Sequence, residues 1–287
     1  MIVRVKVPAT TANIGPGFDC LGLALNLFNT VEVKLGGNNV DRDHLVYKAV
    51  KKVYDSAGKI MPEVEVNVYG DIPIERGLGS SASCIVGGII AANKLLGNVL
   101  SFEQMLNLAV EMEGHPDNVV PAFVGGMTVS VQENGKTYFV KIDVPKSIMF
   151  VGLIPEIKLS TKKARAVLPD MITQKDAVFN VSRVAFLISS LMTGKLDNLS
   201  FALQDRLHQP YRKTLIPDFD VIFDAARYYG AKGVFLSGAG PTIIAVNDVN
   251  NTAFIESIER TVDDLQIKWN VVPLFANTRG AEIIEVR

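Results

Sequence analysis

The stretch from Pro73 to Ser83 combines three features that anion binding requires at one place. Gly77 and Gly79 allow the backbone to approach a bulky ligand closely, and the serines that follow add hydroxyl groups. The next residues, up to Leu96, contain no proline and are rich in Ala, Ile, Val and Leu, which predicts a buried helix beginning at the serines. The N-terminus of a helix offers free N–H groups and a positive dipole, so the stretch predicts a phosphate site. It is not a Walker loop, because no lysine follows the last glycine.

A second cluster of polar residues, Glu111 to Asn118, ends a helix that opens with the capping box Ser101-Phe102-Glu103-Gln104. Glu111 and Glu113 are two positions apart, about 200° around a helix, so at most one of them can face the phosphate loop. One histidine with no second His or Cys nearby argues against zinc. Magnesium fits better, since it prefers oxygen ligands and takes only one or two of them from the protein.

A third segment, Pro8 to Asp19, contains two glycines and two prolines, which predicts a loop and excludes both a helix and a central strand. Asn13 and Asp19 stand among these rigid positions. A surface turn would explain the pattern, but a site that grips a small polar ligand would require the same rigidity.

The composition is that of a well-packed globular enzyme, with 287 residues, 48% hydrophobic and 21% charged. Twenty-nine Lys and Arg against thirty Asp and Glu create no global field that would favour nucleic acid or an anionic membrane. The N-terminus lacks the apolar run of a signal peptide, and no apolar window reaches the roughly 20 residues of a membrane span. We therefore expect a cytoplasmic protein, and two cysteines agree with a reduced compartment.

Strands and helices alternate along the chain from its start. Helices are expected over 45–54, 82–96, 176–192, 196–207 and 252–265, and strands over 1–7, 27–35, 63–69, 148–154, 233–236, 243–246, 268–274 and 281–286. Asn134-Gly135 predicts a hairpin of strands 127–132 and 137–142. Val144-Pro145 is the expected domain boundary, dividing the chain into domains 1–145 and 146–287.

The eleven-residue string 73–83 resembles the phosphate loop of the GHMP kinases. Three further strings resemble those of the homoserine kinase family: 8–19, 208–217 with Arg212, and Ser237-Gly238-Ala239-Gly240-Pro241-Thr242. The resemblance implies a two-domain α+β fold with a ribosomal-protein-like N-terminal half and a ferredoxin-like C-terminal half. It also implies phosphorylation of L-homoserine to O-phospho-L-homoserine, a step toward threonine, with ATP and Mg²⁺.

The resemblance implies a role for particular residues. The ATP-binding residues would be Pro73, Ile74, Glu75, Arg76, Gly77, Leu78, Gly79, Ser80, Ser81, Ala82 and Ser83. Ser81 and Glu111 would hold the metal, with Glu113 in reserve, and Ser81, Glu111 and Asn118 would be catalytic. The substrate-binding residues would be Asn13, Asp19, His115, Asn118, Thr161, Arg165, Arg212 and Gly238.

Homoserine is a zwitterion, so its site needs a carboxylate for the ammonium group and guanidinium groups for the carboxylate. Asp19 fits the first need, and Arg165 and Arg212, expected on opposite sides of the second domain, fit the second. Asn118 cannot take a proton at neutral pH, so the resemblance implies direct attack by the substrate hydroxyl. His115 and Asp117 stay open as alternative bases.

Asp43 and His44 stand where the family usually carries an Asn that meets the nucleotide base, so the base contacts are not predicted. Two other functions remain as alternatives: another small-molecule kinase of the superfamily, and a nucleotide-binding regulator that has lost turnover. A homodimer also stays open, and no nucleic-acid or membrane partner is expected.

Overall fold

The computed structural model describes residues 1–37 and 41–287. Within these residues the chain forms two sheets, one of six strands and one of four, whose paired strands are all antiparallel. The first sheet consists of β1 (Ile2–Ala12), β2 (Leu21–Leu35), β3 (Val64–Gly70), β4 (Met127–Glu133), β5 (Lys136–Ile142) and β10 (Glu282–Val286). The order is β10-β1-β2-β4-β5, and β3 pairs with the second half of the long strand β2. The predicted hairpin about Asn134-Gly135 is confirmed as β4 and β5.

Four helices pack on the first sheet: α1 (Leu45–Ser56), α2 (Ser80–Leu95), α3 (Phe102–Glu113) and α4 (Pro116–Val124). The helix that begins at the serines, α2, lies in the middle and contacts the other three helices as well as β1 and β2. Small and apolar residues on all its sides explain this central position, because a helix without a polar face is stable only when it is surrounded. The core of this domain therefore holds the phosphate loop in place.

The second sheet has the order β7-β8-β6-β9, with β6 (Ile148–Pro155), β7 (Gly233–Leu236), β8 (Ile243–Asp248) and β9 (Trp269–Leu274). Helix α9 (Phe219–Tyr228) precedes β7, and α10 (Ala253–Asp263) joins β8 to β9. This βαββαβ succession with that strand order is the expected ferredoxin-like arrangement. All eight residues of β6 are buried, as its continuous apolar run predicts.

Between β6 and α9 the chain inserts four helices, α5 (Thr161–Ala166), α6 (Gln174–Met192), α7 (Leu199–Ala202) and α8 (Gln209–Arg212). The helix expected over 196–207 is helical only up to Ala202, as a short 3₁₀ helix (Leu196–Asn198) followed by α7, because the chain then leaves the helical conformation before α8 begins. In that segment the Asp205 carboxylate accepts backbone N–H groups of residues 207–209. A side chain thus replaces the helical hydrogen bonds.

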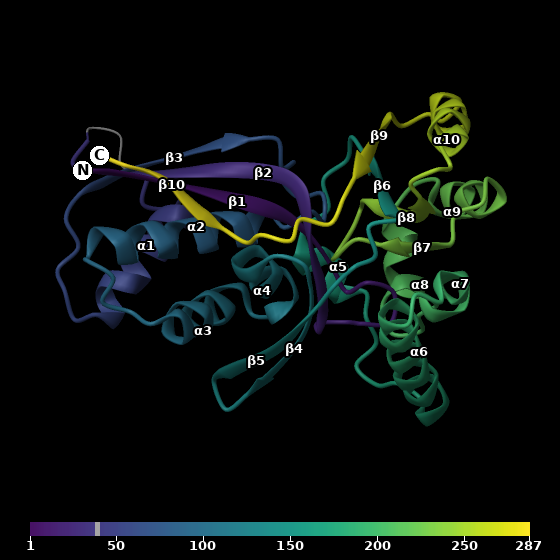
Figure 1. The fold of residues 1–287 in the computed structure, drawn as a ribbon, viewed down its shortest axis with the longest axis horizontal. Coiled ribbons are helices and arrows are strands. Elements are labelled where there is room, and N and C mark those ends of the chain that lie inside the picture. The colour runs from purple at the N-terminus through teal and green to yellow at the C-terminus, as the bar shows by residue number, and fades with distance from the viewer. Residues whose placement is uncertain (38–40) are drawn as a thin grey trace.

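Two boundaries also differ from the prediction. The first strand continues through Ala12, although Pro8 was expected to begin a loop; the pairing with β2 shifts register at Pro8/Ala9, and β10 pairs only with residues 3–6. A bulge of this kind accommodates a proline within a strand. The second correction concerns domain 146–287, because β10 returns to the first sheet. Figure 1 shows this yellow strand beside β1, with both termini at the same end of the molecule.

Three clusters of buried side chains form the core. One lies between the first sheet and its helices, and another between the second sheet, α9 and α10. The third combines residues of both domains, including Leu21 and Leu23 of β2 with Phe235 of β7 and Leu187 of α6. Since apolar burial is the dominant stabilising contribution in folding, this shared cluster holds the two domains in one relative position.

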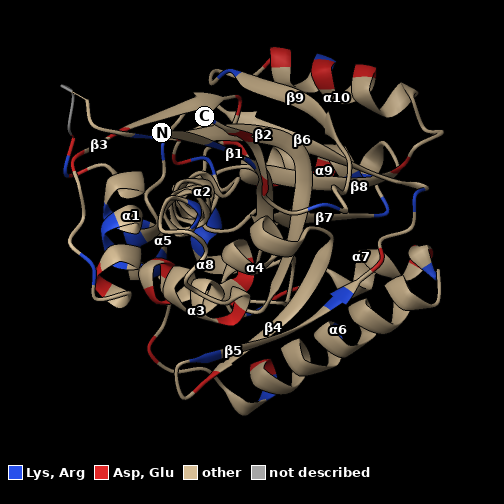
Figure 2. Cartoon of the chain, turned by 60° about the vertical axis from the view of Figure 1, so that its left-hand side comes forward, with Lys and Arg blue, Asp and Glu red and all other residues tan. Residues whose placement is uncertain are grey.

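Charged residues lie mostly on the outer elements. Figure 2 shows acidic and basic residues interspersed along α10, while the central strands carry few of either sign. Across residues 1–37 and 41–287, none of the helices combines the length and apolarity needed to cross a membrane.

Candidate active site

The phosphate loop sits between β1 and the glycine-rich turn 237–242. Thr10 N donates to Leu78 O at 3.2 Å, and Ser237 Oγ donates to Gly77 O at 2.6 Å. Gly77 and Gly79 have φ of 75° and 72°, and a Cβ at Gly79 would stand 2.0 Å from Thr10 Oγ1. Both positions therefore require glycine, for their φ and for the close approach of neighbouring chain.

Helix α2 begins directly at this loop, with Gly79 as its N-cap, so no side chain of the N-cap residue caps the first turn. The N–H groups of that turn have no partner within the helix and point along the axis toward the loop. Together with the positive end of the helix dipole they form an environment suited to phosphate oxygens.

A cleft with a cavity volume of about 490 Å³ lies in front of this helix end and extends to the second domain. Every predicted substrate-binding residue lines it: Asn13, Asp19, His115, Asn118, Thr161, Arg165, Arg212 and Gly238. Of the predicted phosphate loop, Ile74, Glu75, Arg76, Gly77, Gly79, Ser80 and Ser81 line it, whereas Pro73, Leu78, Ala82 and Ser83 do not. The structure thus brings together segments that lie far apart in the sequence.

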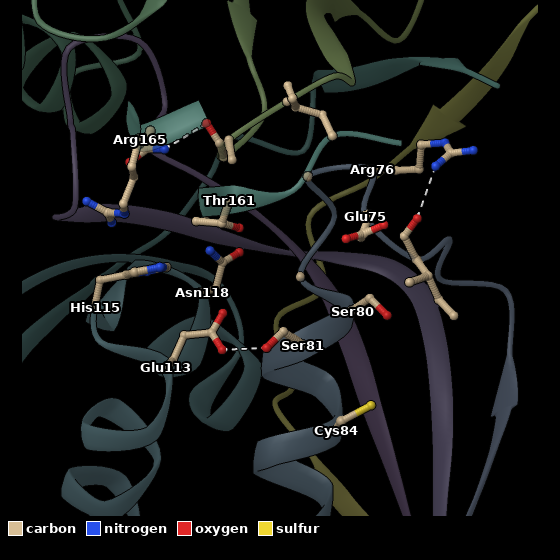
Figure 3. A pocket seen from close by; sticks show the side chains of 18 of the residues that line it. Glu75, Arg76, Ser80, Ser81, Cys84, Glu113, His115, Asn118, Thr161 and Arg165 are labelled. Carbon is tan, nitrogen blue, oxygen red and sulfur yellow. Dashed lines mark hydrogen bonds between the residues drawn. The ribbon is translucent and has the colours of Figure 1, made fainter. Parts of the chain in front are cut away.

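The acidic residue beside Ser81 is Glu113, the residue held in reserve, and not the expected Glu111. Ser81 Oγ donates to Glu113 Oε2 at 2.7 Å, as Figure 3 shows, whereas the Glu111 side chain is 61% exposed and pairs with Lys52 of α1 at 2.7 Å. Glu113 is the last residue of α3, and Gly114 with φ of 90° ends the helix there. Burial raises the pKa of Glu113, and the hydrogen bond from Ser81 offsets part of this effect.

His115 and Asp117 form a close pair at the start of α4. His115 Nδ1 lies 2.5 Å from Asp117 Oδ1, and Asp117 is 1% exposed. Burial lowers the pKa of His115, but the hydrogen bond and charge of Asp117, supported by Glu113 and Asp19, outweigh it, so the pKa is raised. Ligand atoms of Asp19, His115 and Asp117 lie within 4.8 Å of one another, yet a guanidinium already occupies the Asp19 carboxylate.

That guanidinium belongs to Arg165 of α5, which binds Asp19 with two parallel hydrogen bonds of 2.7 and 3.0 Å. Arg212 of α8 is 1% exposed and donates to Ala164 O at 3.2 Å and Gly238 O at 3.1 Å. Burial and the charge of Arg165 lower the pKa of Arg212 to about 10. The two arginines were expected on opposite sides of the second domain, but helices α5 and α8 place them next to each other.

Sequence reasoning missed the residues that support these arginines. Both guanidinium groups lie over the ring of Phe18, at 5.5 and 5.1 Å from its centroid. His208 is fully buried; its Nε2 donates to Gly15 O at 2.8 Å, and its Nδ1 accepts from Arg212 at 3.2 Å. The only signal in the sequence was their position inside the two strings that resemble homoserine kinases.

At the other end of the cleft, His44 and Cys84 line the wall beside Ile74. His44 is the N-cap of α1, and its Nδ1 accepts from Val46 N at 3.2 Å. Burial raises the pKa of the Cys84 thiol to about 11, which leaves it unreactive at neutral pH.

Two family profiles match the two halves of this architecture. The family described as GHMP kinases N terminal domain matches residues 44–126, and GHMP kinases C terminal matches residues 187–256. The fold and the site thus define a GHMP kinase.

Relatives that match over their full length identify the family within the GHMP kinases. The chain is 46% identical to a homoserine kinase of Caldicellulosiruptor saccharolyticus, covering 100% of this chain and 98% of the relative. It is 44% identical to one of Clostridium botulinum, covering 99% of both. The crystal structure of homoserine kinase from Cytophaga hutchinsonii superimposes with a TM-score of 0.88 at 29% identity, over 99% of this chain and 97% of that one. The chain therefore belongs to the homoserine kinase family of the GHMP kinases.

Proposed function

We propose that this protein transfers the γ-phosphoryl group of ATP to the side-chain hydroxyl of L-homoserine, forming O-phospho-L-homoserine and ADP. The observation that carries the proposal is the opposite charge of Asp19 and the two arginines in the same cleft as the phosphate loop. Homologous homoserine kinases at 44% to 46% identity over full length support the same reaction. The product would serve threonine biosynthesis; the cytoplasmic location and the homodimer stay predictions.

The phosphate end of the cleft, residues 75–81, would receive the ATP phosphates. Free N–H groups on the first turn of α2 can donate to phosphate oxygens, and the two glycines leave the room that a phosphate chain needs. These donors hold their positions before the ligand arrives, because the turn 237–242 and β1 support the loop through the hydrogen bonds of Gly77 and Leu78.

The donor set at Ser81 and Glu113 fits magnesium. It consists of a hydroxyl and a carboxylate oxygen, and within the described residues Glu113 is a partly buried carboxylate without an ion pair. A buried carboxylate is costly unless a cation compensates it. We propose that Ser81 and Glu113 hold Mg²⁺, which would neutralise charge on the transferring phosphoryl group.

The amino-acid end of the cleft, made by Asp19, Arg165 and Arg212, would receive homoserine. Asp19 would bind the substrate ammonium and the arginines its carboxylate, in a geometry that favours two parallel hydrogen bonds. Without substrate, Arg165 and Asp19 satisfy each other. A zwitterion can replace each of their charges, whereas an anion without an ammonium group would leave Asp19 unpaired.

The transfer step needs no dedicated base in this arrangement. The homoserine oxygen forms a bond to the γ-phosphorus, the bond to the bridging oxygen of ADP breaks, and the hydroxyl proton passes to an oxygen of the transferred group. Asn118 has no basic atom. Asp117 is buried, and its Oδ1 already contacts His115 Nδ1.

The test is ADP release by the purified protein with ATP and Mg²⁺ and a panel of homoserine, mevalonate, serine and shikimate. Turnover should be highest with L-homoserine and should give O-phospho-L-homoserine. Higher turnover with mevalonate would favour another kinase of the superfamily, and no turnover with any acceptor, together with ATP binding, would favour the regulator.

A further inference from the structure

One buried side chain connects the phosphate loop to the residue at the centre of the cleft. Thr10 lies near the end of β1 and is 0% exposed; its Oγ1 donates to Asn118 Oδ1 at 2.7 Å. The backbone N–H of Thr10 donates to Leu78 O of the phosphate loop. Gly79, the N-cap of α2, lies directly against the Thr10 hydroxyl, since a Cβ there would stand 2.0 Å from Oγ1.

This hydrogen bond fixes the position of the Asn118 side chain, with the amide oxygen directed to Thr10. An asparagine amide offers an accepting oxygen and a donating nitrogen, and a half-turn about its last bond exchanges them. Because the Thr10 hydroxyl holds the oxygen, the NH₂ group is left for the cleft. Figure 3 shows Asn118 between Thr161 and the Ser81–Glu113 pair, with its nitrogen on the side of Arg165.

We propose that Thr10 is a positioning residue that holds the Asn118 side chain in place, with its NH₂ group toward the reacting hydroxyl and the transferring phosphoryl group. In this orientation Asn118 donates hydrogen bonds to oxygens on which negative charge develops. In the opposite orientation its oxygen would face those oxygens and repel them. This inference rests on the proposed function, because it assigns a role in that reaction.

The same contact connects the part of the cleft that would bind ATP with the part that would bind homoserine. Thr10 touches the loop that would bind ATP and also orients the amide that would face homoserine. A shift of the loop would therefore move the Thr10 hydroxyl and release Asn118. The glycine at position 79 permits this contact, because any side chain there would take the space of the hydroxyl.

The test measures homoserine kinase turnover of the full-length protein after Thr10→Val, which keeps the shape of the side chain and removes the hydroxyl. Loss of one such hydrogen bond should lower kcat by about 10-fold, with little change in the KM for ATP. Thr10→Ser keeps the hydroxyl and should retain most of the wild-type kcat.

The matched control is Thr128→Val. Thr128 is also 0% exposed and lies on a strand of the same sheet, but among the described residues its hydroxyl has no hydrogen-bond partner. It should keep the wild-type kcat. Thr10→Ala serves as a second variant without the hydroxyl if Thr10→Val does not fold, as judged by thermal unfolding.

A double-mutant cycle separates positioning from general structural damage. If Thr10 acts through Asn118, then Thr10→Val should cause no further loss of kcat in an Asn118→Ala background. Independent, multiplying losses would overturn the proposal, as would full activity of Thr10→Val or equal losses in Thr10→Ser and Thr10→Val. An inactive wild type would instead contradict the proposed function, and this inference with it.

Discussion

At the phosphate end of the cleft the ligand meets backbone N–H groups and glycines, whereas at the amino-acid end it meets charged side chains. The phosphate end is supported by hydrogen bonds between backbone segments of β1, the loop and the turn 237–242. The amino-acid end is supported by an ion pair, Asp19 with Arg165, and by the buried guanidinium of Arg212. The first end is ready for its ligand, while the second must exchange partners when its ligand binds.

This difference follows from the ligands. A phosphate chain presents many equivalent oxygens, which a row of N–H groups can meet at little entropic cost. A zwitterion presents two opposite charges at a fixed distance, and only side chains of opposite sign can distinguish them. Substitutions at the amino-acid end should therefore change the KM for homoserine, and those at the phosphate end should change kcat or the KM for ATP.

The largest effect is expected from Arg165→Ala. The substitution removes one guanidinium partner of the substrate carboxylate and leaves Asp19 without its ion pair. Homoserine binding should therefore weaken by about 2–5 kcal/mol. The KM for ATP should stay unchanged. In Arg165→Lys the KM for homoserine should lie between those of the wild type and Arg165→Ala, because an ammonium cannot make two parallel hydrogen bonds. Initial rates with each substrate varied separately measure this. Lys163→Ala, an exposed position on the same helix, is the control. A selective rise in the KM for ATP would assign Arg165 to phosphate.

The next effect is expected from Glu113→Gln at the phosphate end. If Glu113 holds Mg²⁺ with Ser81, kcat should fall by at least about 100-fold, with a small change in the KM for homoserine. Glu111→Gln is the matched control, since its carboxylate is exposed and pairs with Lys52. Steady-state kinetics over a range of Mg²⁺ concentrations give both constants. A large loss of kcat in Glu111→Gln together with wild-type kcat in Glu113→Gln would assign the Mg²⁺-binding role to Glu111.

A smaller effect is expected from Gly79→Ala, which tests whether the phosphate end depends on its backbone. The positive φ and the 2.0 Å approach to Thr10 should reduce the free energy of unfolding by about 1–3 kcal/mol and raise the KM for ATP. Gly97→Ala separates the two causes, because Gly97 also has a positive φ but meets no described atom within 4 Å. Equal unfolding midpoints in urea for both variants would show that only φ matters.

The smallest effect concerns pH. Asp117 raises the pKa of His115 in the folded state, so protonation of His115 stabilises the fold fully below its unfolded pKa of about 6.5. This contribution disappears as the pH rises through the folded pKa. The stability lost in His115→Gln should thus be larger at pH 6 than at pH 9, by urea unfolding. In an Asp117→Asn background this difference between pH 6 and pH 9 should vanish. If His115→Gln loses the same stability at both pH values in the wild-type background, the stabilising role of the His115–Asp117 pair is contradicted.

Much of the fold could be predicted because its signals are local. The capping box at Ser101, the Asn134-Gly135 turn and the continuous apolar run of β6 each depend on a few neighbouring residues. The break after α7 was not predictable in this way. It depends on Asp205, whose carboxylate accepts hydrogen bonds from backbone N–H groups that would otherwise bond within a helix. The residue type alone, within a periodic apolar pattern, does not indicate that its side chain makes these bonds.

The candidate site divides in the same manner. Its residues could be identified from strings that carry a family resemblance, and all of the predicted substrate-binding residues line one cleft. The contacts among these residues could not be predicted from the sequence. The Asp19–Arg165 pair, the seat of both arginines on Phe18 and the Thr10–Asn118 hydrogen bond each join positions far apart in the chain.

The sequence by itself determined the positions where only glycine fits, the oxygen and guanidinium groups available for chemistry, and the strands and longer helices with a clear periodic pattern, since these depend on residue type and short-range periodicity. It gave no signal for α4, α5, α8 and α9. Tertiary structure decided the rest. Glu113 rather than Glu111 meets Ser81 because the packing of α3 against α1 and α2 sets the rotation of the helix, and two residues of spacing turn a side chain to nearly the opposite side. β10 joins the first sheet because β1 has an open edge there, which the local pattern of five residues cannot reveal.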